Sequence, residues 1–174
     1  MNRKSVLHHA AGLVLLAATS LPMASPLKPS ELNCRFHAEA GADGQVTLKF
    51  TLRNTGNREL HLLRWGSPFE GGWLGPFVQA STPQGELPFQ GAMRKRADPS
   101  AQDYLLLKPR ETLKAELRLA DAYAWPPAAG GSAGPLKLKA SWRWHDVMAD
   151  GKPPRPRSRH EGMDQHCGEI TLER

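Results

Sequence analysis

The chain has 174 residues, of which 40% are hydrophobic, and a formal net charge of +6. This length is typical of a single domain. Its two local basic clusters, Arg94–Arg96 and Lys152–Arg159, contain no aromatic residue. Nucleic-acid-binding surfaces combine basic residues with stacking aromatics, so the composition argues against a nucleic-acid partner.

The first 24 residues have the order of a secretory signal peptide. Arg3 and Lys4 precede an apolar run, Ala10–Leu21, and small residues suited to cleavage lie around Ala24. The run is shorter than the span of about 20 residues that a bilayer requires. An uncleaved interfacial anchor is the alternative. We expect an exported protein, periplasmic or secreted, with one mature domain over residues 25–174 and no membrane attachment once the signal is removed.

Two cysteines, Cys34 and Cys167, lie near the two ends of the expected mature chain. In an exported protein the simplest interpretation is a disulfide that joins the first strand to the last. Two buried thiols or a metal pair are the alternatives.

Apolar and polar residues alternate with a period of two along much of the chain. The pattern is clearest in Val46–Arg53, and it recurs in Leu113–Leu119 and Leu136–Trp144. This period is typical of strands with one buried face and one wet face. The segments expected to form strands are 32–38, 46–53, 60–65, 77–80, 86–89, 104–107, 113–119, 136–144 and 167–172.

Turn residues separate these segments. Residues 128–135 predict a flexible connection, and the Pro- and Arg-rich stretch 150–159 predicts an extended, mobile loop because proline cannot donate to a central ladder. No amphipathic helix is evident. Short strands, frequent turns and a predicted disulfide indicate an all-β fold, an antiparallel immunoglobulin-like β-sandwich of seven to nine short strands.

No arrangement of residues predicts catalysis or a cofactor. The tail sequence from His160 to Asp164 has Asp164 where the zinc motif His-Glu-x-x-His needs its second histidine, and Gly162 disfavours the helix which that motif requires. His160, His166 and Cys167 could form a soft-metal cluster, but the disulfide competes for Cys167. There is no Gly-rich phosphate loop and no Gly-x-Ser-x-Gly. We therefore expect a protein that is not an enzyme, with no bound metal or cofactor.

The most distinctive stretch runs from Leu62 to Tyr123. Trp65 closes a strand before a Gly- and Pro-rich turn, and three cations, Arg94, Lys95 and Arg96, follow a later strand. The simplest account is a solvated loop between two strands, with Tyr104 in the core.

The phrases LRNTG, LLRWGSPFEG, ELPFQGAMRKRADPSAQDYLLLKPRETL and LADAY resemble the amino-terminal, non-catalytic region of deuterolysin-type zinc endopeptidases, also called aspzincins, which include peptidyl-Lys metalloendopeptidases. The resemblance covers about Val46 to Trp144. A complete family member carries His-Glu-x-x-His and a further Asp ligand after this region, and no such motif follows Trp144 here. The resemblance therefore implies a pro-domain-like module that stands alone, and no catalytic residue is carried over.

Two functions follow as hypotheses. In the first, the resemblance implies a protein that inhibits such a protease or assists its folding, with Lys95, flanked by Arg94 and Arg96, offered to a carboxylate-lined pocket. Aromatic residues that tend to dominate interface energies would then serve as apolar anchors, namely Trp65, Phe69, Trp73 and Tyr104. In the second, the chain is an Ig-like binding or adhesion module with no protease partner.

Overall fold

The computed structural model describes residues 31–125 and 134–173. The expected signal peptide, residues 1–24, lies outside the described residues, and so do residues 128–133 of the expected flexible connection. Within the described part, no helix is long and apolar enough to cross a membrane.

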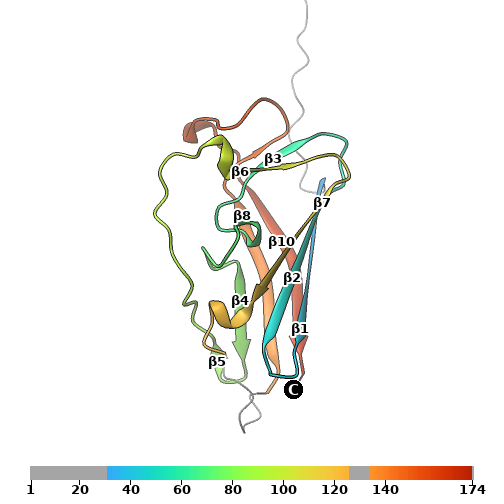
Figure 1. The fold of residues 1–174 in the computed structure, drawn as a ribbon, viewed down its shortest axis with the longest axis vertical. Helices are drawn as coiled ribbons and strands as arrows, with labels where there is room; N and C mark the ends of the chain where they lie inside the picture. The colour runs from blue at the N-terminus through green and yellow to red at the C-terminus, as the bar shows by residue number, and fades with distance from the viewer. Residues whose placement is uncertain (1–30, 126–133, 174) are drawn as a thin grey trace, which may run out of the picture.

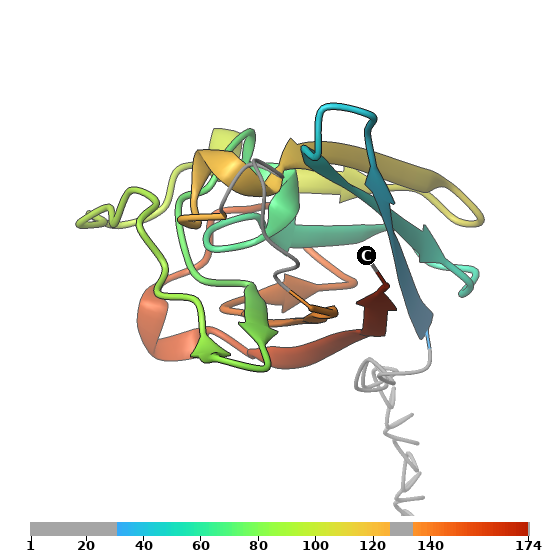
Figure 2. The ribbon, with the colours of Figure 1, turned by 90° about the horizontal axis from the view of Figure 1, so that it is seen from below.

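Two antiparallel sheets form the body of the molecule. The first sheet has the order β1 (Leu32–Ala40), β2 (Val46–Asn54) and β7 (Thr112–Arg118). The second sheet has the order β10 (Met163–Leu172), β8 (Leu136–Trp144), β4 (Val78–Thr82) and β5 (Gly85–Glu86). Seen from below, the two sheets lie as two layers (Figure 2). The expected antiparallel β-sandwich is confirmed.

A third, smaller sheet covers one end of the sandwich, at the top of Figure 1. Its strands, in order, are β6 (Tyr104–Leu107), β3 (Leu60–Leu63) and β9 (Val147–Met148). The described residues therefore contain ten strands, one more than the upper limit expected from the sequence. The additional strand, β9, has two residues, too few to show an alternation.

Alternating side chains fill the space between the layers. The apolar residues of β2 are all 1% exposed or less, while Lys49 and Arg53 on the other face remain accessible. Phe50 contacts Phe36, Phe77 and Trp142 at ring-centroid distances of 5.8, 6.0 and 6.3 Å. A shift of one residue in the register would turn these side chains to water, so the alternation fixes the pairing.

The disulfide between Cys34 and Cys167 is confirmed. It joins β1 to β10, with 4.7 Å between the two Cα atoms, and so links the edges of the two main sheets. Cys167 lies where β10 bulges against β8, between His166 and Gly168. Gly168 has a φ of 112°, which a residue with a side chain rarely adopts.

Within the described residues, four short 3-10 helices lie between the strands: η2 (Pro68–Glu70), η3 (Ala101–Asp103), η4 (Leu119–Asp121) and η5 (Arg157–Arg159). The last interrupts the extended loop that the sequence predicts over residues 150–159. In this stretch Arg155 pairs with the fully buried Asp146, and Arg157 donates to the carbonyl oxygens of Arg96 and Ala97. That the stretch is mobile stays a prediction.

Candidate protein-binding surface

The basic segment lies on a long connection between β5 and β6, which runs along one side of the molecule in yellow-green (Figure 1). Met93 is 75% exposed, and Arg94 and Lys95 are also exposed. We call these three consecutive residues the exposed tripeptide. Arg96, which follows it, is partly buried.

The backbone before the exposed tripeptide is fixed to the sandwich. The Gln90 amide donates to Ala122 O at 2.7 Å, and the Ala92 amide donates to Trp73 O at 3.1 Å. Phe89 forms a β-bridge with Tyr123, and their rings meet edge to face with centroids 5.7 Å apart. The connection is therefore attached up to the residue before Met93.

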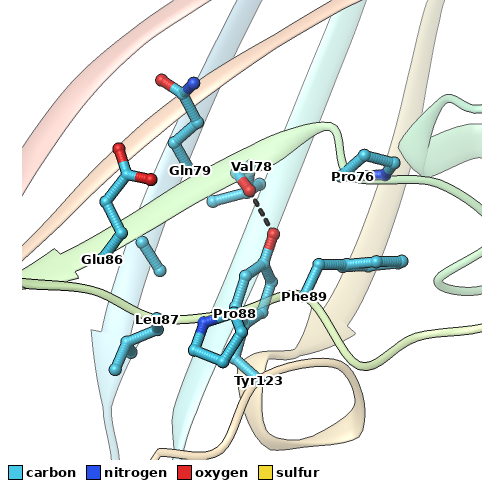
Figure 3. A pocket seen from close by; sticks show the side chains of 9 residues that line it. Pro76, Val78, Gln79, Glu86, Leu87, Pro88, Phe89 and Tyr123 are labelled. Carbon is cyan, nitrogen blue, oxygen red and sulfur yellow. Dashed lines mark hydrogen bonds between the residues drawn. The ribbon is translucent and has the colours of Figure 1, made fainter.

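Phe89 and Tyr123 also line an open groove of about 500 Å³ against β4, shown in Figure 3. The Tyr123 hydroxyl donates a hydrogen bond to the Val78 carbonyl oxygen, and burial raises the pKa of Tyr123 to about 12. This bond occupies a backbone acceptor of β4. The groove thus shows how the start of the connection is fastened to the second sheet.

The backbone after the exposed tripeptide is fixed by ionic contacts. The Arg96 guanidinium pairs with Glu70, whose side chain is 5% exposed, and lies over the Trp65 ring with its Cζ 5.3 Å from the ring centroid. Arg157 donates to the carbonyl oxygens of Arg96 and Ala97 and places its own Cζ 6.0 Å from the same ring. Trp65 is therefore the platform on which two arginines rest, a cation–π arrangement.

Trp65 itself is held from its polar end. Its Nε1 donates to Asp103 Oδ1 at 3.1 Å. Burial alone would raise the pKa of Asp103, but hydrogen bonds from Ser100 and Trp65, together with the charge of Arg64, outweigh it and hold the pKa below its usual value. The carboxylate thus stays ionised, and it fixes both the indole and the start of η3 through a capping box with Ser100.

Tyr104 belongs to a buried polar network. Its hydroxyl donates to Asp146 Oδ2 at 2.8 Å, and Asp146 is fully buried. Asp146 also accepts from Arg155 Nε at 2.8 Å and from the Glu161 amide at 3.0 Å. This network ties β6 to the stretch 155–161 that carries Arg157.

The remaining two predicted residues lie elsewhere. Trp73 is 6% exposed, stacks on Phe77 with 4.7 Å between ring centroids, and donates its Nε1 to Arg118 O at 2.8 Å. Phe69 is half-buried against Trp142 and Trp144. Trp73 is thus a core residue whose ring is stacked and whose polar atom is engaged, and it offers a partner little surface.

The structure therefore divides the seven predicted partner-binding residues into groups. It brings Trp65 and Arg96 into contact, exposes Arg94 and Lys95, and buries Tyr104 and Trp73, while Phe69 stays half-buried. That this set binds a partner stays a prediction. Sequence reasoning missed the residues that hold the loop. No periodic signal marks Glu70 or Asp146, and Arg155 and Arg157 were noted only as members of the basic cluster Lys152–Arg159.

No group of three or more His, Cys, Asp or Glu side chains within residues 31–125 and 134–173 could hold a metal ion. The described site offers the exposed cations Arg94 and Lys95 beside an aromatic platform, Trp65. Carboxylates hold the platform and the arginine that rests on it. Such an arrangement is suited to recognition of an acidic surface.

Fold and site together define a disulfide-linked β-sandwich that presents a fixed cationic loop. No family model matches the chain. Over 101 residues it is 34% identical to a protein named extracellular protease from Aeromonas hydrophila. The match covers 58% of this chain and 29% of that relative, so the chain spans less than a third of the relative's length and contains a region related to part of it.

Proposed function

We propose that this chain is an exported, non-enzymatic, protease-associated module that binds the catalytic domain of a deuterolysin-type zinc endopeptidase and inhibits it or assists its folding. Three observations support the proposal. The chain shares a region with part of an extracellular protease, its sequence phrases resemble the non-catalytic half of that endopeptidase family, and its disulfide suits an oxidising compartment outside the cytosol.

The observation that carries the proposal is the fixing of the exposed tripeptide from both sides. Hydrogen bonds at Gln90 and Ala92 hold the backbone before it, and the Glu70–Arg96 pair holds the residue after it. Ordering the backbone of one free residue costs about 1–2 kcal/mol. A loop whose flanks are already ordered loses less entropy on binding than a free loop, so more of its contact energy remains as affinity.

Lys95 is the proposed contact to the active-site cleft. It is exposed and lies between two further cations in the sequence. A protease specific for lysine needs an anionic pocket, and an ammonium–carboxylate contact is a charge-assisted hydrogen bond. Arg94 would add electrostatic attraction at the rim, where charges mainly raise the association rate.

The test is an inhibition titration of a lysine-specific endopeptidase of this type with the chain lacking residues 1–24. We expect the wild-type chain to inhibit, and Lys95→Ala to weaken inhibition by about tenfold or more, since hydrogen bonds to charged groups contribute about 1.5–3 kcal/mol. Lys108→Ala is the matched control, because Lys108 is an exposed lysine in the turn between β6 and β7. It should inhibit like the wild type.

A parallel refolding assay separates the two roles. If the chain assists folding, the yield of active protease from denatured catalytic domain rises when the chain is present during refolding. If neither inhibition nor a gain in refolding yield occurs at micromolar excess, the proposal is wrong. Capture from the exported proteins of the source organism would then test the alternative of an adhesion module.

A further inference from the structure

A second pocket lies beside the fixed loop and differs from the groove of Figure 3 in its chemistry. Its volume is about 380 Å³, and its lining residues are Leu63, Trp65, Arg96, His145, Arg157 and His160. Four of these six side chains are basic, one is an indole, and none is acidic. The pocket brings together residues from β3, from the basic loop and from the stretch between β8 and β10.

Both arginines keep donors that no described residue occupies. Arg157 uses Nε for Asp98 at 3.0 Å and Nη2 for the two loop carbonyl oxygens. Arg96 pairs with Glu70 through Nη2. Among the described residues, the Nη1 atom of each guanidinium makes no hydrogen bond, although each carries two N–H donors. A planar oxyanion could accept from both.

Two histidines complete the lining and offer ring nitrogens that can donate hydrogen bonds. The pKa of His145 is lowered by its partial burial and by the charges of Arg143, His160 and Arg96. His160 Nε2 lies 3.1 Å from Arg155 O, and a carbonyl oxygen only accepts, so Nε2 carries the hydrogen. Asp146 Oδ2 lies 4.0 Å from the same Nε2, but Asp146 is fully buried and already bound by Arg155. The lining of the pocket contains no acidic side chain, but its two arginines are paired outside the lining with Glu70 and Asp98, so an anion would meet cations that are already partly neutralised.

We propose that this pocket binds a carboxylate, namely an Asp or Glu side chain on the surface of the protein partner. The inference rests on the proposed function for the identity of that partner. Arg96 follows Lys95 directly, so the pocket lies next to the contact proposed for the active-site cleft. Guanidinium groups match the planar geometry of a carboxylate, and Trp65 forms an apolar wall that excludes water from the contact.

The test uses two short peptides and no protease, so its failure can be told from failure of the proposed function. The probe is acetyl-Gly-Glu-Gly-amide, and the matched control is acetyl-Gly-Gln-Gly-amide. Binding is followed by NMR of the histidine rings at pH 6. We expect saturable shifts of His145 and His160 with the Glu peptide only, and a rise in the pKa of His145 on binding, because a bound anion favours its charged form.

Three variants test whether the Glu peptide binds in this pocket, and a third probe tests which oxyanion the pocket prefers. Arg157→Gln should weaken binding of the Glu peptide by about tenfold. Arg35→Gln removes the same charge from an exposed position on β1 and should leave binding of the Glu peptide unchanged. Because Arg157→Gln also loosens the basic loop, His145→Asn is the second variant. It removes one imidazole of the lining without touching the contacts of Arg157, and it should weaken binding of the Glu peptide at both pH 6 and pH 8.

Inorganic phosphate distinguishes a protein carboxylate from a free oxyanion. Equal shifts with the Glu and Gln peptides, saturation by phosphate alone, or a loss of affinity in Arg35→Gln equal to that in Arg157→Gln would each overturn the proposal.

Discussion

At Asp146 a single carboxylate joins β6 to the stretch 155–161. It accepts hydrogen bonds from Tyr104 on β6, from Arg155 and from the Glu161 amide, and it is fully buried. A buried ion pair adds little net stability compared with a well-packed apolar pair, because both charges lose their hydration. Removal of one partner is a different matter, since the other charge is then left buried and unpaired.

We expect Asp146→Asn to lower the free energy of unfolding by about 3 kcal/mol, because Arg155 keeps its charge in a site where its side chain is only 20% exposed. Urea denaturation measures the change. The control is Asp164→Asn, which breaks the solvent-exposed pair with Arg143 and should cost about 0.5 kcal/mol or less. Equal losses in the two variants would show that the buried network has no special role.

Among the elements, the disulfide between β1 and β10 has the largest expected effect on stability. The two cysteines are 133 positions apart, and a cross-link across a loop of that size restricts the unfolded chain strongly. In the chain-entropy model we expect the Cys34→Ser, Cys167→Ser double variant to lose about 4–5 kcal/mol. Urea denaturation with and without dithiothreitol checks this. Reductant should lower the midpoint of the wild type and leave the double variant unchanged; a wild-type midpoint that ignores full reduction would contradict it.

An element could be predicted from the sequence where the residue pattern that indicates it lies within the element itself. The strands β2, β7 and β8 were predictable because their alternation lies within seven to nine residues, and the disulfide because an exported chain with two cysteines has one simple pairing. The two-residue strand β9 has no period to detect. It exists because Leu62 pairs with Val147 and Leu63 bonds to Asp146 O, contacts that no local pattern encodes.

The candidate site was predictable only in its exposed part. A run of three cations between strands indicates a solvated loop, and Arg94 and Lys95 are indeed exposed. Its fixing depends on Glu70 and Arg157, which lie 26 residues before and 61 residues after Arg96. The sequence left two accounts of Tyr104 open, a core residue and a partner-binding anchor, because an aromatic beside a loop looks the same whether it faces a partner or supports the loop; the structure buries Tyr104.

At the scale of the whole molecule, the buried apolar residues form two hydrophobic core clusters. The larger cluster lies between the main sheets and includes Tyr123, and the smaller comprises Leu63, Trp65, Tyr104 and Met148. Each cluster holds one of the two tyrosines of the chain. Burial raises the pKa of Tyr123 to about 12, and burial together with the hydrogen bond to Asp146 raises the pKa of Tyr104. The contribution of both core clusters to the free energy of unfolding should therefore change over the same range of alkaline pH.

The raised pKa values of the two buried tyrosines predict how the free energy of unfolding falls at high pH. Above pH 10 the tyrosines of the unfolded chain lose their protons, whereas those of the folded chain keep them, so the unfolded state binds fewer protons and the free energy of unfolding falls as pH rises. Each tyrosine should contribute a slope of about 1.4 kcal/mol per pH unit between pH 10 and 12. Urea denaturation at several pH values measures the slope. Tyr104→Phe and Tyr123→Phe should each remove one tyrosine's share, while lysines contribute equally to all three proteins. A slope unchanged in either variant would mean that the corresponding core admits the tyrosinate, and so that it opens to solvent before the molecule unfolds.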